Sequence, residues 1–264
     1  MKYLLVYAHP EPSSLNGSIK DFILQELQHQ GHQVLVSDLY AMNWQATLQA
    51  TDCLGKDVEE PFDIARDTLK AFQNATQSPD IQAEQEKLMW ADAVLFQFPL
   101  WWFSMPAILK GWFDRVYTNG FAYGVGEHND LHWGDRYGEG VFAGKRAMLL
   151  VSAGGWEEHY SERGVNGAMT DLLFPITHGT LFYAGFEVLP SFIIYKTHKV
   201  NAERFTKIKA ELAERLQNIF IDQAIPYRPQ NAGDYEIPGL ILKKDKAADQ
   251  TGLAIHQLNP VRRQ

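Results

Sequence analysis

The stretch from residue 93 to residue 116 constrains the fold more than any other part of this chain. It opens with an apolar run, 93–98, interrupted only by Gln97, which is typical of a strand buried on both faces of a parallel sheet. Pro106 then stands where the first turn of a helix tolerates proline, and apolar residues recur beyond it at helical spacing. Between strand and helix lie three large rings: Trp101, Trp102 and Phe103. The order strand, aromatic loop, helix predicts an α/β fold.

The three rings allow two interpretations. They could be ordinary core, or they could form an exposed flat wall for a planar ligand. In open α/β sheets ligands bind beyond the carboxyl ends of the strands, where this loop is expected. A short loop between two prolines is an awkward place to bury three rings, so we favour the wall.

Length and composition bound the remaining possibilities. A chain of 264 residues with 45% hydrophobic content suits one large α/β domain with or without an appendage. The net charge of −8 and the lack of any long Lys/Arg run argue against a nucleic-acid partner. Cys53 is the only cysteine, which excludes an intrachain disulfide and favours a reducing compartment. The apolar start, 4–8, is too short for a signal peptide or a membrane span, so we expect a cytoplasmic protein.

Other segments continue the alternation of strands and helices. Strands are predicted at 4–8, 33–38, 93–98, 147–152 and 186–195, the last interrupted by Pro190. Helices are predicted from residue 15 to 27, at 64–72, from a cap at Asp80 to Met89, up to Val116, at 169–181 and at 202–220. This pattern predicts a flavodoxin-like, doubly wound, five-stranded parallel sheet of strand order 2-1-3-4-5. We place the domain at 1–222 and an extension that packs on the domain or on a partner subunit at 223–264.

The loop after the first strand has the composition of an anion site. It carries His9 and two serines, Ser13 and Ser14, either of which could cap the helix that follows. Free backbone N–H groups and the helix dipole point at such a loop. A plain N-cap beside a solvated histidine explains the same residues equally well.

A pair of glycines follows the fourth predicted strand. Gly154 and Gly155 would let backbone N–H groups approach a ligand closely, and Tyr160 and Asn166 follow within reach of the same edge. A phosphate cradle, a flat aromatic wall and this glycine turn together indicate a flavin nucleotide.

Other motifs carry less weight. The spacing Gly138-x-Gly140-x-x-Ala143 matches a dinucleotide fingerprint by letter, but it precedes a strand instead of following one. The chain also lacks a nucleoside-triphosphate loop motif. Two histidines and two aspartates in the polar loop could be imagined as metal ligands, although we expect them to be solvated: His128, Asp130, His132 and Asp135.

Several segments together resemble the NAD(P)H:quinone oxidoreductases of the DT-diaphorase type. They are His9 with Ser14-Leu15-Asn16, 37–43, 78–81, 96–116, Phe121-Ala122-Tyr123, Gly154-Gly155 and Tyr160. The resemblance covers nearly the whole chain. It implies a homodimer with its active sites at the subunit interface, and a cofactor that is FAD rather than FMN. Hydride would pass from NAD(P)H to the flavin and two electrons from there to a quinone, in a ping-pong reaction. Two alternatives stay open, namely a regulatory subunit of a potassium-efflux transporter and a flavodoxin-type electron carrier.

The resemblance also assigns roles to residues. The flavin phosphates would be held by His9, Ser14, Leu15 and Asn16. The isoalloxazine ring would be lined by Pro99, Leu100, Trp101, Trp102 and Phe103. Its N1/O2 side would meet Ser152, Ala153, Gly154, Gly155 and Tyr160, of which the last three act in catalysis together with Asn166. Asp114 and Arg204 would lie near the adenine, and the substrate would contact Tyr123 of the other subunit, Val125, Trp102 and Phe103.

Three departures from the family pattern stand out. Asn166 replaces the family's histidine, for which His159 is the possible substitute, and Val125 replaces a pocket tyrosine. The loop 126–144 is longer than in the mammalian enzymes, which favours a functional loop. Some relatives bind a structural metal, but only His178 of its three ligands is kept, with Phe182 and Tyr227 in the other places, so we predict no metal.

Overall fold

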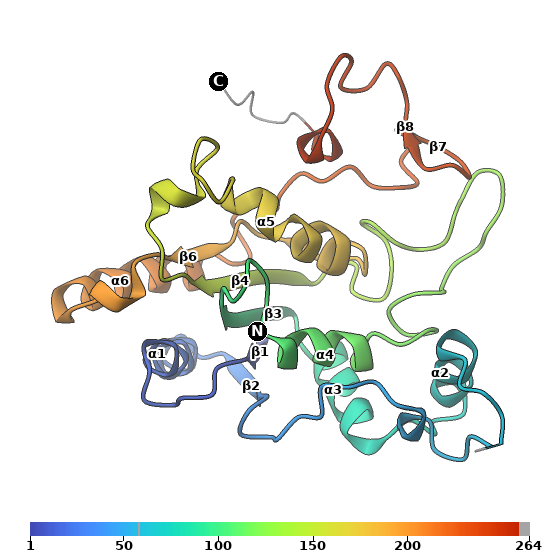
Figure 1. The fold of residues 1–264 in the computed structure, drawn as a ribbon, viewed down its shortest axis with the longest axis horizontal. Helices are drawn as coiled ribbons and strands as arrows, with labels where there is room; N and C mark the ends of the chain where they lie inside the picture. The colour runs from blue at the N-terminus through green and yellow to red at the C-terminus, as the bar shows by residue number, and fades with distance from the viewer. Residues whose placement is uncertain (58, 259–264) are drawn as a thin grey trace.

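A computed structural model describes residues 1–57 and 59–258 (Figure 1). The last six residues of the predicted extension therefore lie outside the described part of the chain. The main sheet is parallel, in the order β2-β1-β3-β4-β5, with β6 also pairing with β4. Its strands are β1 (Lys2–Tyr7), β2 (Gln33–Asp38), β3 (Ala93–Pro99), β4 (Arg146–Ser152), β5 (Glu187–Val188) and β6 (Phe192–Ile194). The predicted flavodoxin-like order is confirmed.

The predicted fifth strand is split in two. β5 pairs with the start of β4 and β6 with its end, and Pro190 lies in the gap between them. Proline has no N–H to donate to a neighbouring strand, so the predicted strand is interrupted at Pro190.

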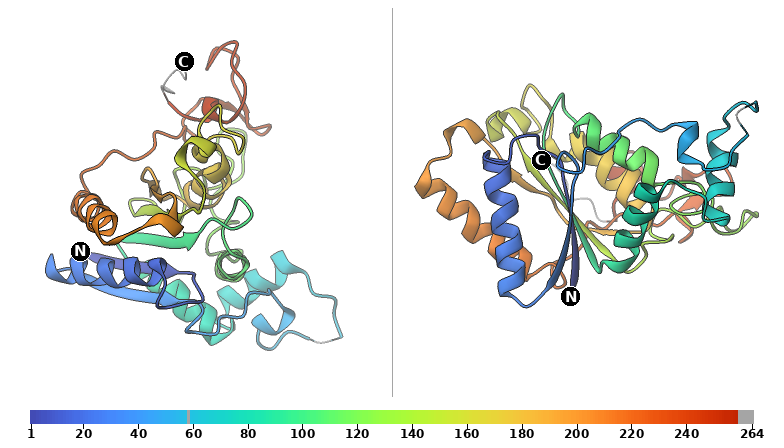
Figure 2. Two further views of the ribbon diagram at one scale, coloured as in Figure 1. Left: turned by 60° about the vertical axis from the view of Figure 1, so that its left-hand side comes forward. Right: turned by 90° about the horizontal axis from the view of Figure 1, so that it is seen from below.

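Helices cover both faces of the sheet (Figure 2). They are α1 (Leu15–His29), α2 (Ile64–Gln73), α3 (Pro79–Trp90), α4 (Ala107–Val116), α5 (Met169–Ile176) and α6 (Ala202–Gln217). Alternate residues of β1 divide between the two cores, because successive side chains of a strand point to opposite faces. Leu5 packs with α1 and α6, whereas Leu4 packs with α3, α4 and α5. All seven residues of β3 are buried, as expected for the central strand.

The predicted cap of α3 is wrong. The helix begins at Pro79 with Ser78 as the N-cap residue, so Asp80 already lies inside the first turn. Its carboxylate is used elsewhere, in an ion pair with Arg115 of α4 at 2.7 Å. Burial alone would raise the pKa of Asp80, but hydrogen bonds from Arg115 and Ser78 outweigh it and lower that pKa.

Arg115 joins three separate parts of the chain. Its side chain is only 3% exposed and pairs with Asp52 as well as Asp80, with Nη2 2.7 Å from Oδ1 of Asp52. The guanidinium also lies over the ring of Trp44, 4.6 Å from its centroid. Trp44 and Asp52 belong to the long excursion between β2 and α2, which begins at Leu39 and ends at Asp63, so this one cation holds the excursion against α3 and α4.

The C-terminal segment packs on the domain. The Ile225 N–H donates to the carbonyl of Val188, and the Tyr227 hydroxyl lies 2.8 Å from that of Thr177. Beyond them a short hairpin forms from β7 (Tyr235–Glu236) and β8 (Ile241–Leu242). Within the described ranges, no helix combines the length and apolar character needed to cross a membrane.

Candidate functional site

A buried polar chain ties together the carboxyl ends of β1, β3 and β4. The Gln97 side-chain amide donates to the Asn16 carbonyl at 2.7 Å, and the Ser152 hydroxyl donates to Asn16 Oδ1 at 3.0 Å. The Ala8 N–H donates to the Gln97 carbonyl at 2.9 Å. Asn16 therefore fixes the start of α1 through its side-chain oxygen and its backbone carbonyl. The role of Gln97 was missed, although its place as the sole polar residue of the run 93–98 was a usable signal.

The first loop offers several unpaired donors. Nδ1 of His9 lies 3.1 Å from the Glu11 nitrogen, 3.2 Å from the Glu11 carbonyl oxygen and 3.1 Å from the Ser14 hydroxyl, whereas Nε2 has no hydrogen-bond partner among the described residues. Ser14 caps α1 by accepting from the Gly17 N–H. The N–H groups of Leu15 and Asn16, in the first helical turn, have no acceptor among the described residues. This arrangement fits a phosphate group.

Gly17 brings this loop close to the helix. A Cβ at this position would lie 1.8 Å from the Pro12 carbonyl oxygen and 2.7 Å from its carbon. Only glycine permits this approach of two backbone segments. We did not predict this residue.

The aromatic loop is a tight turn that presents its rings outward. Trp101 and Ser104 exchange two backbone hydrogen bonds of 3.0 Å, and Trp102 and Phe103 between them have φ values of 49° and 62°. Positive φ at both central positions defines a type I′ turn, which is strained for bulky residues. Trp102 is 94% exposed and its two neighbours are about half exposed. The core interpretation of the rings is wrong, and a wall is what the loop presents.

The fourth loop places Gly154, Gly155 and Tyr160 together. A Cβ on Gly155 would lie 2.8 Å from the Tyr160 ring, so the ring packs directly on the glycine. Gly154 faces open space, since no atom lies within 4 Å of a Cβ built there. Neither glycine N–H has an acceptor within the described ranges. Asn166 enters the same loop by donating its N–H to the His159 carbonyl at 3.0 Å.

Three predicted site residues lie elsewhere on this chain. Tyr123 and Asp114 line a groove of about 620 Å³ beside α4, which includes none of the fourth-loop residues. Arg204 instead binds the carbonyls of Tyr195 and Lys196, next to a cavity of about 340 Å³ between α1 and the start of α6. Asp114 and Arg204, both expected near an adenine, thus lie at different cavities.

Comparison with known proteins identifies the family. The model of the flavodoxin-like fold matches residues 1–219. The chain is 49% identical to ribosyldihydronicotinamide dehydrogenase-like protein traD of Penicillium crustosum over 97% of this chain and 95% of the relative. It is 38% identical to NAD(P)H dehydrogenase [quinone] 1 of Cavia porcellus over 94% of this chain and 88% of the relative.

A solved structure agrees over the full length. A Klebsiella pneumoniae protein described as a candidate quinone reductase is 60% identical, with a TM-score of 0.96, over 98% of this chain and 100% of that one. The chain belongs to the flavodoxin-like quinone reductase family. Members of this family are NAD(P)H-dependent flavoproteins, and the predicted resemblance is confirmed.

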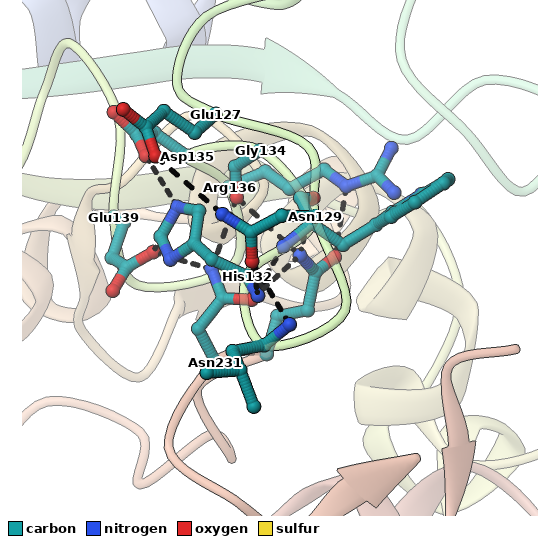
Figure 3. A network of polar contacts seen from close by, with 11 residues as sticks. Glu127, Asn129, His132, Gly134, Asp135, Arg136, Glu139 and Asn231 are labelled. Carbon is teal, nitrogen blue, oxygen red and sulfur yellow. Dashed lines mark hydrogen bonds and ion pairs between the residues drawn. The ribbon is translucent and has the colours of Figure 1, made fainter. Parts of the chain in front are cut away.

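In this family member the long loop 126–144 is folded by its own polar contacts (Figure 3). Nε2 of His132 lies 2.8 Å from Oδ1 of Asp135 and 3.8 Å from Oε2 of Glu139. Asn231 of the C-terminal segment donates to Glu139 at 2.6 Å and to the Gly134 carbonyl at 3.0 Å. The ligand atoms of His132, Asp135 and Glu139 lie within 4.8 Å of one another. These hydrogen bonds explain the arrangement and anchor the loop to the C-terminal segment.

Around His178 this quinone reductase family member has a cluster of rings. His178 stacks on Phe174 at 4.5 Å and meets the edge of Tyr227 at 4.9 Å. Burial, with a smaller contribution from His256, lowers the pKa of His178 to about 4. The imidazole is therefore neutral at physiological pH.

Proposed function

We propose that this protein catalyses the FAD-dependent, two-electron reduction of quinones by NAD(P)H in a ping-pong reaction. The observation that carries the proposal is that three ligand-binding features meet at one edge of the sheet. They are the N–H groups at the start of α1, the exposed aromatic turn and the N–H groups of Gly154 and Gly155, where both sets of N–H groups lack an acceptor in residues 1–57 and 59–258. In the net reaction NAD(P)H, a proton and a quinone become NAD(P)⁺ and a hydroquinone.

Each feature suits one part of a flavin. The first loop would hold the phosphates through His9, Ser14 and the start of α1. Trp102 and Phe103 would lie against the ring system, while Gly154, Gly155 and Tyr160 would donate to its N1/O2 side. A bound flavin would supply the group that accepts hydride from the donor and passes it to the quinone. Fixed donors stabilise the negative charge that develops there without having to reorganise.

The cavity between α1 and α6 supports FAD over FMN. It is lined by Leu15 and Ser18 on one side and by Asn201 and Phe205 on the other, directly beside the proposed phosphate loop. An adenosine half would fill this space, with Phe205 available for ring contact. FMN would end at the phosphate and leave the cavity unused.

We also propose a homodimer in which a second copy completes the active site. Tyr123 lines a groove that includes none of the fourth-loop residues of its own chain, so it would contact a substrate there from another subunit, and Val125, two residues on, would do the same. The groove that Tyr123 lines is largely apolar, and Trp102 and Val165 are more than nine-tenths exposed. Such surfaces favour association. The single cysteine, Cys53, is buried and free, which supports a reducing compartment such as the cytoplasm.

Purification tests the whole proposal. We expect a yellow dimer with about one FAD per chain, identified by absorbance and mass, that oxidises NAD(P)H with a quinone and shows parallel double-reciprocal lines. A colourless protein that takes up no flavin would overturn the proposal. Bound flavin without NAD(P)H turnover would instead indicate an electron carrier.

Asn166 predicts a flat pH profile for flavin reduction. An amide can donate a hydrogen bond but cannot take up a proton, so the reduction rate in stopped flow should change little between about pH 5.5 and 8.5. Asn166→His should introduce a step near pH 6.5, the ordinary pKa of histidine. A step already present in the unmodified protein and abolished by His159→Ala would assign the role to His159 instead.

A further inference from the structure

Two lysines and a tryptophan form a cationic patch at the edge of the fourth loop. Trp156 directly follows Gly155 and is 42% exposed. Nζ of Lys196 lies 3.9 Å from the centroid of its ring, and Nζ of Lys199 lies 4.8 Å from it. Both ammonium groups are therefore held by cation–π contacts next to the glycine pair.

The backbone fixes Lys196 at this place. Its N–H donates to the Gly155 carbonyl at 2.9 Å, and its own carbonyl accepts from Arg204 at 3.1 Å. Lys196 has φ 51° and ψ 45°, a left-handed conformation that a side chain adopts at a cost.

The nearby acidic groups do not neutralise the patch. Glu158 approaches Lys196 at 3.8 Å but is 72% exposed, so this pair is weak. The Glu157 carboxylate acts on Tyr195, whose pKa is raised by burial and, to a lesser extent, by that carboxylate, and Glu157 forms no ion pair with either lysine in the described part of the chain. Lys199 has no ion pair in the described part of the chain. Two ammonium groups less than about 10 Å apart repel each other within one Debye length, and a shared anion would relieve that repulsion.

We propose that Lys196, Lys199 and Trp156 form the subsite for the phosphate groups of the hydride donor. The inference rests on the proposed function, which puts the dihydronicotinamide beside Gly154 and Gly155. The ribose and phosphates attached to the dihydronicotinamide ring must extend beyond the glycine pair. Trp156, the first residue of the cationic patch, directly follows Gly155. Lysine ammonium groups bind phosphate well as point charges.

The subsite would make this protein select phosphorylated donors. Its relatives carry the names of two kinds of enzyme, NAD(P)H dehydrogenases and ribosyldihydronicotinamide dehydrogenases. Ribosyldihydronicotinamide has no phosphate, so it gains nothing from Lys196 and Lys199. The patch therefore favours NADH and NADPH.

The test compares donors in a double variant, Lys196→Gln with Lys199→Gln. We expect KM for NADPH and NADH to rise about tenfold or more, with kcat nearly unchanged and kcat/KM for ribosyldihydronicotinamide within about twofold of the original. Calorimetric binding of NADP⁺ to the oxidised protein should weaken by a similar factor. A matched control, Lys207→Gln with Lys244→Gln, removes the same charge from exposed positions and should leave all these values unchanged.

The outcomes separate this inference from the proposed function. Equal changes for all three donors, or none, would overturn the phosphate subsite while leaving quinone reduction intact. The same holds if the unmodified protein prefers ribosyldihydronicotinamide to both dinucleotides. If no donor reduces the flavin of the unmodified protein, the proposed function itself fails.

Discussion

Replacing Arg115 by methionine is expected to lower the free energy of unfolding by about 3–5 kcal/mol, because it leaves a buried carboxylate without its charge partner. Asp52 is only 6% exposed and receives two hydrogen bonds from the guanidinium, at 2.7 and 3.1 Å. Methionine fills much of the same volume, so the loss is chiefly electrostatic. Urea denaturation followed by circular dichroism measures the change.

Lys110→Met is the matched control for this variant. Lys110 pairs with Asp114 on the same helix, but both side chains are about half exposed, and such pairs contribute under about 1 kcal/mol. If Arg115→Met also costs less than about 1 kcal/mol, water reaches Asp52 and the excursion is held by other contacts.

The contribution of Asp80 to the free energy of unfolding depends on pH in a defined direction. Because its pKa is lowered on folding, that contribution is present above its unfolded pKa of about 3.9 and is lost as the pH falls.

Gly17→Ala is expected to weaken flavin binding about tenfold or more. The added methyl group collides with the Pro12 carbonyl, so the loop that carries His9 and Ser14 must move away from α1. The hydrogen-bond donors of His9, Ser14 and the start of α1 would then no longer point at the same phosphate group. Glycine to alanine within a helix would otherwise stabilise the fold by about 1 kcal/mol, so a loss here can be assigned to the collision.

Fluorescence titration of the flavin-free protein with FAD measures this effect. Gly179→Ala provides the control, since Gly179 is exposed and nothing lies within 4 Å of a Cβ built there. Unchanged affinity of Gly17→Ala for FAD together with a raised melting temperature would show that the loop accommodates the methyl group at no cost. Gly17 would then play no part in the site.

Local pattern was enough to predict the sheet. The runs that became β1, β3 and β4 are almost entirely apolar because both faces of each strand are covered, and such runs are visible in sequence. The cap of α3 was predicted wrongly by giving Asp80 more weight than Ser78-Pro79. Proline is favoured at the first helical position, and that rule would have placed the boundary correctly.

Only those parts of the site that lie directly at the carboxyl ends of strands could be predicted from the sequence. Loops that follow parallel strands must meet at one edge, so His9, Trp102 and Gly154 could be grouped in advance. The inward direction of the Asn16 side chain, the contact at Gly17 and the place of Lys196 beside Trp156 depend on residues distant in sequence. No spacing rule expresses such contacts. The role expected of Tyr123 from another subunit stays a prediction, and on this chain its side chain lines the groove beside α4.

The aromatic turn has a consequence for anyone who improves this protein by design. Asn-Gly is the pair that a type I′ turn prefers, and Trp102-Phe103 is among the least suitable. Optimising the chain for thermal tolerance, whether by computation or by selection on expression level, would rewrite these two positions early and would register each change as an improvement. The resulting protein would fold better and lose its ring-binding surface. Screens on this scaffold therefore need to score bound flavin colour alongside yield.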